Sequence, residues 1–373
     1  MKRLTLLTCL FVLVGLANAS DLKFIASEEI KYDDNIYLTK SDKKDSFIST
    51  TRLGALYGMQ VPNSSLKANF AAIGGYNAYT EDNGKNGYWD ALVQADLANE
   101  NMSLGDIFVL TSDPANSELT DRAKRINNVA YFNYITSKKK MFSFGVKLSD
   151  IYTKYLKDEW EGLNRNRLNL GAGVYYNLSE KTSFLLEYTY TILSYQKNDD
   201  SDSKGGIVAL GVEGQIAPKV KGTAKATYNY RDYDKELAGY KNYADLFGFD
   251  VSLAWEPTTR NLVRLGAHRN FEETIFTNNR YFVLTGVELY ASQKVMEKVT
   301  LSLTLGYDNL AYPEEAYGVK RSDDLYTIRP EIGYQIKEWL SSGIWYQYRK
   351  RDSNISSAEY DNNRAGIYLK ATF

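Results

Sequence analysis

From residue 22 onward the chain repeats one pattern, in which segments of about ten to fifteen residues alternate apolar with polar side chains. A period of two is that of a β-strand, whose successive side chains point to opposite faces of a sheet. The connections between the segments are short turns and long polar loops, and these two kinds also alternate along the chain. The sequence therefore predicts an antiparallel sheet with its short turns at one end and its long loops at the other.

The connections give the number of strands. The short turns lie at residues 62–64, 100, 138–140, 180, 218, 257–259, 294–297 and 337. The long loops span residues 39–46, 81–86, 113–124, 157–165, 197–204, 235–242, 275–279, 312–323 and 352–359. Nine hairpins joined by eight turns predict eighteen strands, at residues 24–37, 47–61, 66–79, 88–98, 102–111, 126–136, 141–155, 166–178, 183–196, 206–217, 220–233, 244–255, 261–274, 280–292, 299–311, 325–336, 340–351 and 364–373. Sixteen strands is the alternative, because the segments at Phe24 and Met102 are weakly patterned.

The alternation separates an oily face from a polar one. Along residues 299–308, for example, one face carries Val, Leu, Leu, Leu and Tyr, and the other carries Thr, Ser, Thr, Gly and Asp. An even-numbered all-β barrel with its oily face toward lipid leaves no unpaired edge in the membrane. The mean hydropathy of −0.42 is compatible with this, since a barrel carries its membrane character in alternation. The competing interpretation is a large soluble sandwich, but two packed sheets do not require loops sorted by length.

Two residues break the pattern of the oily face. Pro330 lies on the oily side and lacks a backbone N–H, so we expect a bulge there. Arg269 also falls on the oily side if alternation is strict. Either a bulge turns its side chain inward or the side chain extends to the membrane interface. Tyrosines and tryptophans gather near the strand ends, as in an interfacial aromatic belt, although strand propensity alone also favours tyrosine.

The first nineteen residues are typical of a secretory signal peptide. Lys2 and Arg3 precede an apolar run at 4–16 and the small-residue site 17–19. The run is shorter than the ~20 residues that a membrane-spanning helix needs. We therefore predict a signal peptide at 1–19 and one barrel domain at 20–373, in the outer membrane of a Gram-negative-type bacterium with both termini in the periplasm. Because Cys9 is the single cysteine, the predicted mature chain has no thiol chemistry.

Few residues in the sequence match an enzyme or a cofactor site. The 45 basic and 46 acidic residues give no basic patch for nucleic acid. The single histidine, His268, lies in a strand without the serine that a barrel hydrolase needs, so a lumen hydrogen bond is its expected role. The acidic pairs 33–34, 199–200 and 323–324 are expected to be solvated loop charges, with calcium binding as the alternative. We predict no catalytic residue, no metal and no cofactor.

The polar face is expected to line a water-filled lumen, since eighteen strands enclose a channel. The pore-lining candidates are Arg329, Glu331, Arg349, Arg351, Arg364, Lys370, Asp90, Asp96, Asp250 and Asp308. Arg329, Arg349 and Arg364 fall on three consecutive strands as a basic ladder that would favour anions. The alternative is that these arginines only neutralise lumen carboxylates.

The last strand carries a further signal. Its ending, with Gly366, Leu369, Ala371 and the terminal Phe373, resembles the sorting signal that outer-membrane barrels present to the barrel-assembly machinery. The expected surroundings are outer-membrane lipid and lipopolysaccharide, with no nucleic-acid partner.

Three segments resemble the putative beta-barrel porin 2 family. They are the sequence Tyr-Asp-Asp-Asn-Ile-Tyr at 32–37, the closing residues from Tyr346 to Asn363 and Phe373, and Trp-Glu-Pro-Thr at 255–258 with the later Arg269. The resemblance implies the outer-membrane channel for secretion of an exopolysaccharide or capsule, with a periplasmic polysaccharide-export protein and the polysaccharide chain as partners. The alternative is a general diffusion porin for small hydrophilic solutes.

Overall fold

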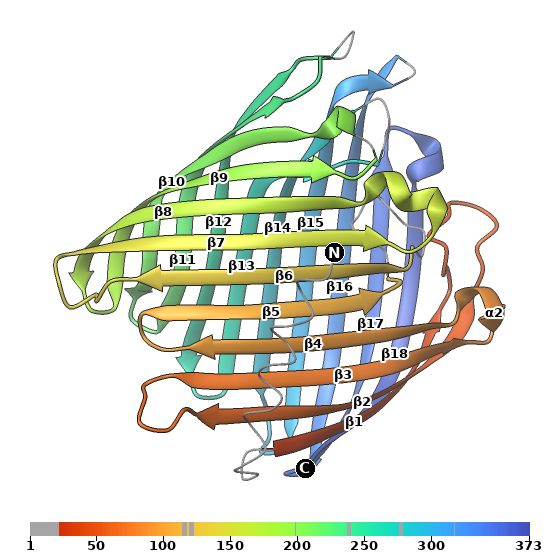
Figure 1. The fold of residues 1–373 in the computed structure, drawn as a ribbon. Helices are drawn as coiled ribbons and strands as arrows, with labels where there is room; N and C mark the ends of the chain where they lie inside the picture. Colours follow the sequence, from red (N-terminus) through yellow and green to blue (C-terminus); the bar gives the residue numbers. More distant parts are fainter. Residues whose placement is uncertain are drawn as a thin grey trace.

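The chain folds into a closed barrel of eighteen antiparallel strands (Figure 1). This computed structural model describes residues 22–113, 118, 123–197, 199–236, 240–275, 279–316 and 318–373. The predicted signal peptide lies outside these residues. The fold class predicted from the sequence is confirmed, and the alternative of sixteen strands is wrong.

Each strand pairs with its neighbours in the sequence, and short helices occur only in connections. The strands are β1 Leu22–Asp33, β2 Ser46–Gln60, β3 Lys67–Tyr79, β4 Tyr88–Ala98, β5 Met102–Thr111, β6 Arg125–Ile135, β7 Phe142–Tyr155, β8 Arg165–Ser179, β9 Thr182–Tyr195, β10 Ser203–Ala217, β11 Val220–Tyr233, β12 Tyr243–Thr258, β13 Asn261–Glu273, β14 Tyr281–Lys294, β15 Val299–Ala316, β16 Val319–Lys337, β17 Leu340–Ser353 and β18 Tyr360–Thr372. The helices are α2 Asn83–Asn86, η2 Asp158–Leu163, η3 Asp199–Ser201 and η4 Ser356–Ala358. No helix in the described ranges is long and apolar enough to cross a bilayer.

Two ends of the barrel differ in their connections, as predicted. Connections such as β8–β9 and β10–β11 are tight turns at one end, here called the short-turn end. The connections that follow the odd-numbered strands, including the one that holds α2, lie at the opposite end, here called the long-loop end (Figure 1). The C-terminal Phe373 lies at the short-turn end, where its carbonyl oxygen accepts a hydrogen bond from Phe24 N at 2.6 Å.

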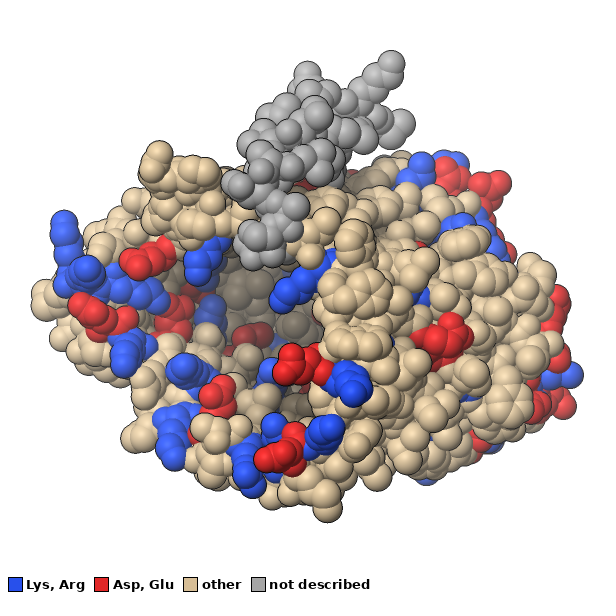
Figure 2. All heavy atoms as spheres, turned by 90° about the horizontal axis from the view of Figure 1, so that it is seen from below, with Lys and Arg blue, Asp and Glu red and all other residues tan. Residues whose placement is uncertain are grey.

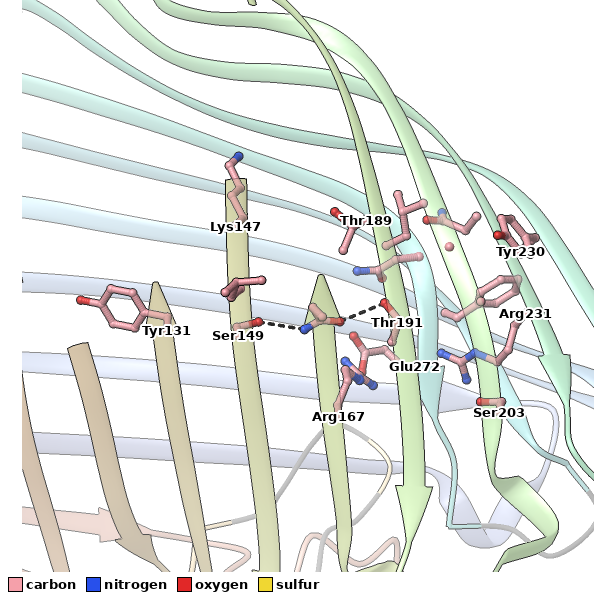
Figure 3. Close-up of a pocket in the computed structure, with 18 of the residues that line it drawn as sticks. Tyr131, Lys147, Ser149, Arg167, Thr189, Thr191, Ser203, Tyr230, Arg231 and Glu272 are labelled. Carbon is pink, nitrogen blue, oxygen red and sulfur yellow. Dashed lines mark hydrogen bonds between the residues drawn. The ribbon is translucent and has the colours of Figure 1, made fainter. Parts of the chain in front are cut away.

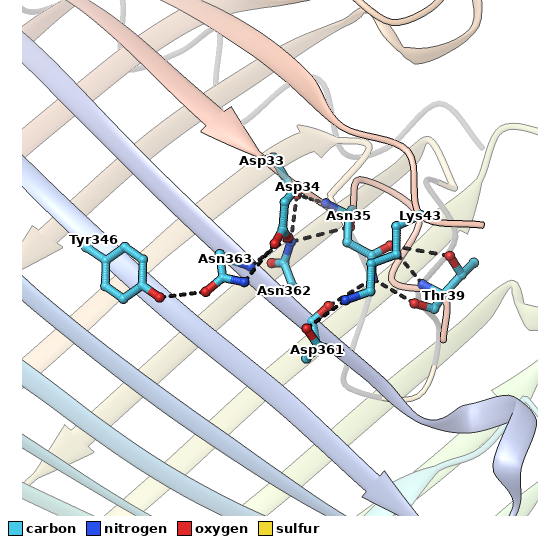
Figure 4. Close-up of polar contacts among 9 residues, drawn as sticks. All are labelled: Asp33, Asp34, Asn35, Thr39, Lys43, Tyr346, Asp361, Asn362 and Asn363. Carbon is cyan, nitrogen blue, oxygen red and sulfur yellow. Dashed lines mark hydrogen bonds and ion pairs between the residues drawn. The ribbon is translucent and has the colours of Figure 1, made fainter. Parts of the chain in front are cut away.

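The barrel closes through β1 and β18, which pair from Ile25–Thr372 to Asp33–Arg364. Polar side chains join the seam at its long-loop end (Figure 4). Asn362 Nδ2 donates to Asp33 Oδ1 at 2.7 Å, and the backbone N–H of Asn35 donates to the same oxygen at 3.0 Å. The expectation of a solvated Asp33 is wrong, because this side chain is 1% exposed. The turn formed by Asn35 also ends β1 at Asp33, four residues before the predicted end at 37.

The outer face carries the large apolar side chains. Phe247 is 78% exposed, Leu210 63% and Ile344 52%, whereas the inner side of the same strands carries buried or polar residues. Aromatic pairs such as Tyr76–Trp89 and Tyr307–Tyr326 join neighbouring strands on the outer face, with ring centroids 4.9 and 5.3 Å apart. An apolar surface of this extent is unfavourable in water and is typical of a barrel wall that faces lipid.

The bulge expected at Pro330 is absent. The register between β16 and β17 is the same on both sides of this residue, from Ile328–Tyr348 to Glu331–Trp345. Pro330 remains opposite Leu303 of β15, and only the bridges to β17 at positions 329 and 330 are missing. The proline, which has no N–H, therefore interrupts the pairing of β16 with β17 at two positions, but it adds no extra residue to β16.

Arg269 stays on the outer face. It pairs with Phe249 of β12 and Thr285 of β14 without a register shift nearby, so no bulge turns it inward. Its Nη1 donates to Thr285 Oγ1 at 2.8 Å, which satisfies one donor of the guanidinium on this face.

The predicted loop at 312–323 is largely strand. β15 and β16 continue as a hairpin to Ala316 and Val319, with one register shift between Ala311 and Glu315. The pairing extends there because Glu315 lies opposite Lys320, and because Leu310 and Leu325 are buried.

Candidate functional site

The polar side chains of the strands form a charged inner wall. From one side the surface is hollowed, and acidic and basic side chains surround the hollow (Figure 2). All ten predicted pore-lining residues lie on this inner face, opposite to the exposed apolar residues. They alternate on their strands with outward-facing residues such as Trp89, Val251, Tyr307, Ile328 and Ile367. Whether they contact a passing solute stays a prediction.

Many charges of the inner wall are paired between strands that are two apart in the barrel. Arg52 Nη2 lies 2.7 Å from Asp90 Oδ2, and Lys147 and Lys225 approach the Glu187 carboxylate at 2.5 and 2.7 Å. His268 Nε2 faces Asp308 Oδ1 at 3.8 Å. Such pairing keeps inward charges compatible with a partly desolvated wall.

The predicted basic ladder is partly neutralised. Arg329 lies 3.3 Å from Glu331 and stacks over the ring of Trp345, 4.3 Å from its centroid. Arg364 Nε lies 2.8 Å from Asp33 Oδ2. Two of the three ladder arginines therefore have a carboxylate partner, which weakens the positive field that they project into the lumen.

Other predicted charges are structural. Arg321 donates to Asp323 from both Nε and Nη2, at 2.6–3.1 Å, and Arg351 Nε lies 3.9 Å from the same carboxylate. Asp323 is 0% exposed, so the expectation of a solvated loop charge at 323 is also wrong. These residues hold β16 and β17 together at the long-loop end.

The lumen narrows where β13 leaves the wall. β12 and β13 are paired only as far as Phe249 and Arg269, although β13 continues to Glu273. Beyond Arg269, β13 remains paired with β14 alone. The freed end turns into the lumen, where it reaches β8, five strands away in the wall.

Glu273 is the central contact of this inward end. Its carboxylate lies 2.9 Å from both Arg167 of β8 and Arg231 of β11, and it accepts a hydrogen bond from Tyr195 Oη at 3.2 Å. The side chain of Glu273 is 1% exposed. Arg165 and Glu272 lie within electrostatic range of this group. A buried carboxylate between two arginines fixes the inward end of β13 to β8 and β11.

Connections at the long-loop end reinforce the narrowing. Ile275, which follows β13, packs against Trp160 and Leu163 of the β7–β8 connection. Glu118 of the β5–β6 connection accepts hydrogen bonds from Thr274 Oγ1 at 2.6 Å and from the backbone N–H of Ile275 at 2.8 Å. Because β13 and β7 are far apart in the wall, these contacts cross the mouth of the barrel.

A polar cavity of about 430 Å³ lies beside the narrowing (Figure 3). Arg167, Arg231 and Glu272, from three different strands, reach it together with hydroxyl and amide side chains. Asn169 of β8 links the two strands beside it, since it donates to Ser149 of β7 and accepts from Thr191 of β9, both at 2.9 Å. No group of three His, Cys, Asp or Glu side chains in the described part of the chain is arranged to hold a metal ion.

The narrowing was not predicted from the sequence. Residues 272 and 273 were placed in a regular strand, where strict alternation would send one carboxylate toward lipid. Two adjacent glutamates at a strand end were the available signal, because a charged side chain in lipid is costly. That signal indicates that the strand leaves the wall, but it does not identify Arg167 and Arg231 as the partners.

Comparison with known families gives the identity of the barrel. The family described as putative beta-barrel porin 2 matches residues 162–373, more than half of the 373 residues. The chain belongs to the putative beta-barrel porin 2 family. A second family, described as a membrane bound beta barrel domain, matches residues 49–218. The predicted family is thus confirmed, and the protein is an outer-membrane β-barrel porin.

Solved structures of other barrels are similar in fold to this porin. Pseudomonas aeruginosa OpdK, solved with vanillate, matches with a TM-score of 0.52 and 10% identity, over 95% of this chain and 99% of that chain. P. aeruginosa OpdL (10% identity) and OccK5, also called OpdH (11% identity), each match with a TM-score of 0.51 over 95% of this chain and 98% of theirs. No curated protein sequence matches the chain significantly. At these identities the likeness concerns the fold alone.

Proposed function

We propose that this porin is a diffusion channel for small hydrophilic solutes, with a preference for anions. The observation that carries the proposal is the inward end of β13, which Glu273 ties across the lumen to Arg167 and Arg231. Folded connections cover the same mouth of the barrel. A lumen narrowed by packed, hydrogen-bonded protein suits a small solute better than a continuous polymer.

The sign of the preference follows from the charges at the narrowing. Five basic side chains, Lys147, Arg165, Arg167, Lys225 and Arg231, face four acidic ones at 187, 250, 272 and 273. Five positive minus four negative charges leave an excess of one positive charge. Fixed charge of one sign in a narrow, weakly screened passage raises the local concentration of the opposite ion.

The export of an exopolysaccharide, with a periplasmic export protein as partner, stays a prediction from the family resemblance. No contact or cavity in the described residues favours it. The orientation with periplasmic termini and extracellular long loops, the sorting role of the last strand and the absence of enzyme activity also remain predictions.

Purified protein in planar bilayers tests the proposal. Under a KCl gradient, we expect chloride to be more permeant than potassium. Glu273→Gln should increase both chloride selectivity and conductance, because two arginines lose their shared partner and the end of β13 is released. Breaking such a buried pair costs about 3–5 kcal/mol, so barrel folding must be checked by heat-modified gel mobility.

Arg231→Gln should reduce chloride selectivity, and Lys350→Gln on the outer face is the matched control that should change neither property. Cation selectivity in the unmodified protein would contradict the anion preference. A deletion strain that loses surface polysaccharide while its uptake of small anions is unchanged would contradict the diffusion role and support export.

A further inference from the structure

A second cavity, separate from the lumen narrowing, lies at the long-loop end. It has a volume of about 320 Å³ and is enclosed by the β11–β12 connection, the end of the β13–β14 connection and the tip of the β15–β16 hairpin. Its lining residues are Tyr233, Tyr240, Lys241, Tyr243, Arg280, Tyr281, Pro313, Glu314 and Lys320. Four tyrosines and three basic side chains around one cavity are not needed to form a barrel wall.

Arg280 is the buried charge of this cavity. The residue is 5% exposed, and its guanidinium stacks over the ring of Tyr233, 4.5 Å from the centroid. Nη2 donates to the carbonyl oxygen of Lys235 at 2.7 Å. Among the residues that the structure describes, Nε and Nη1 have no hydrogen-bond partner. Buried N–H groups of a guanidinium are costly to leave unpaired, and Arg280 keeps a full positive charge that no carboxylate of the described residues neutralises by a hydrogen bond.

The surrounding contacts hold the cavity in shape. Asn279 Oδ1 accepts from the backbone N–H of Glu314 at 2.9 Å, which ties the β13–β14 connection to the hairpin tip. The ring of Tyr240 also lies near Arg280, with 5.9 Å between the guanidinium and the ring centroid. The guanidinium is therefore positioned before any ligand arrives, and this preorganisation lowers the cost of binding.

The charge balance of the cavity favours an anion. Lys241, Arg280 and Lys320 supply three positive charges and Glu314 one negative charge, which leaves an excess of two positive charges. Lys241 and Lys320 are exposed, so they attract a ligand from solution, whereas Arg280 lies deeper. An arginine presents paired N–H donors that match the oxygens of a carboxylate or phosphate.

The tyrosines add a second kind of recognition. Their rings offer flat apolar surfaces and their hydroxyls offer hydrogen bonds, a combination that suits a sugar ring with its C–H faces and hydroxyl groups. A volume of about 320 Å³ lies at the lower end of the range for small-molecule sites, and it fits a ligand of one or two sugar units. We propose that this cavity binds a saccharide that carries a phosphate or carboxylate group.

The simpler explanation is that Arg280 only braces the connections. A bracing arginine would use its donors on the protein, as Arg321 does with Asp323. Arg280 uses Nη2 on the carbonyl oxygen of Lys235, leaves Nε and Nη1 buried without a partner among the described residues, and is one of the residues that line the cavity. The bracing role therefore explains the stacking but not the unused donors.

Titration calorimetry on the full-length protein in detergent micelles tests the site. The probes are glucose 6-phosphate and glucuronate, with glucose as the neutral control, and purified lipopolysaccharide in a separate arm. We expect the acidic sugars to bind at least about tenfold more tightly than glucose, since a charged hydrogen bond is worth more than a neutral one. Binding of lipopolysaccharide alone would identify a lipid headgroup of the same membrane as the source of the acidic saccharide, and binding of the soluble sugars would identify a free one.

Variants locate the binding. Lys241→Gln changes an exposed side chain and should fold normally, and Arg280→Gln removes the buried charge; each should weaken binding by at least about tenfold. Lys350→Gln, on the outer face of β17, is the matched control and should bind as the unmodified protein does. Equal affinity for glucose and glucuronate without lipopolysaccharide binding, or unchanged affinity in folded Lys241→Gln, would overturn the proposal. Neither result bears on the anion preference of the lumen.

Discussion

At the scale of single residues, buried carboxylates hold the covered end of the barrel. Glu273 binds two arginines, whereas Glu118 accepts hydrogen bonds from Thr274 Oγ1, the backbone N–H of Ile275 and, at 2.9 Å, the Tyr312 hydroxyl. Burial raises the pKa of the Glu118 carboxyl above its ordinary value of 4.5, although these hydrogen bonds act in the opposite direction.

Glu118 makes the covering connections sensitive to pH. Because the pKa is higher in the folded connection, docking is most stable below pH 4.5 and weakens as the pH rises through the raised value. We expect more frequent closures in single-channel recordings in acid than at neutral pH. Glu118→Gln should remove this dependence and Glu338→Gln, at the short-turn end, should keep it. Identical pH profiles for the unmodified protein and Glu118→Gln would contradict the assignment.

At the scale of the elements, two strands show how an irregularity is accommodated. β13 leaves its neighbour beyond Arg269 and finds new partners inside the lumen. β16 keeps its register through Pro330 and only loses bridges to β17. Two adjacent glutamates cannot both face inward from a regular strand, so β13 leaves the wall. The apolar ring of Pro330 is tolerated on the lipid face, so β16 stays in the wall.

Pro330 gives a direct test of this account. Pro330→Leu restores a backbone N–H that faces β17 and keeps an apolar side chain toward lipid. We expect a gain in stability of about 1 kcal/mol from the new hydrogen bond, seen as a higher temperature of the folded-to-unfolded gel shift. Ile328→Leu, on the same face of the same strand, is the control without a backbone change. A lower transition temperature in Pro330→Leu would show that the strand needs the proline.

At the scale of the whole molecule, closure depends on residues at opposite ends of the sequence. β1 and β18 pair over nine positions, and the network around Asp33 and Asn362 completes the seam (Figure 4). Closure removes the two free edges that would otherwise expose unpaired backbone groups to lipid.

An engineered disulfide tests the register of closure. Ser27 and Lys370 lie opposite each other, at the separation of about 4.5–5.5 Å that antiparallel partners have and a disulfide allows. Ser27→Cys with Lys370→Cys should cross-link under mild oxidation, seen as a reduction-sensitive change in the gel mobility of the denatured chain. Ala26→Cys with Lys370→Cys places the thiols on opposite faces and should not cross-link. The reverse outcome would contradict an eighteen-strand barrel in this register.

The alternation of side chains and of connection lengths determined the barrel, its strand number and the inner face that carries residues such as Arg349 and Asp250. These features were predictable because lipid and water impose a period of two on every strand, and each short turn fixes the direction of the next strand. The predicted boundaries failed where the connections fold back, as at 312–323 and after Asp33.

Only the tertiary structure decided where the lumen narrows and which charged side chains have no partner of opposite charge. Glu273 meets Arg167 and Arg231, and Arg280 meets Tyr233, because the closed wall brings distant strands within reach across its interior. Sequence spacing carries no information about such contacts, since a strand specifies which face a side chain points to but not what lies opposite it through the lumen.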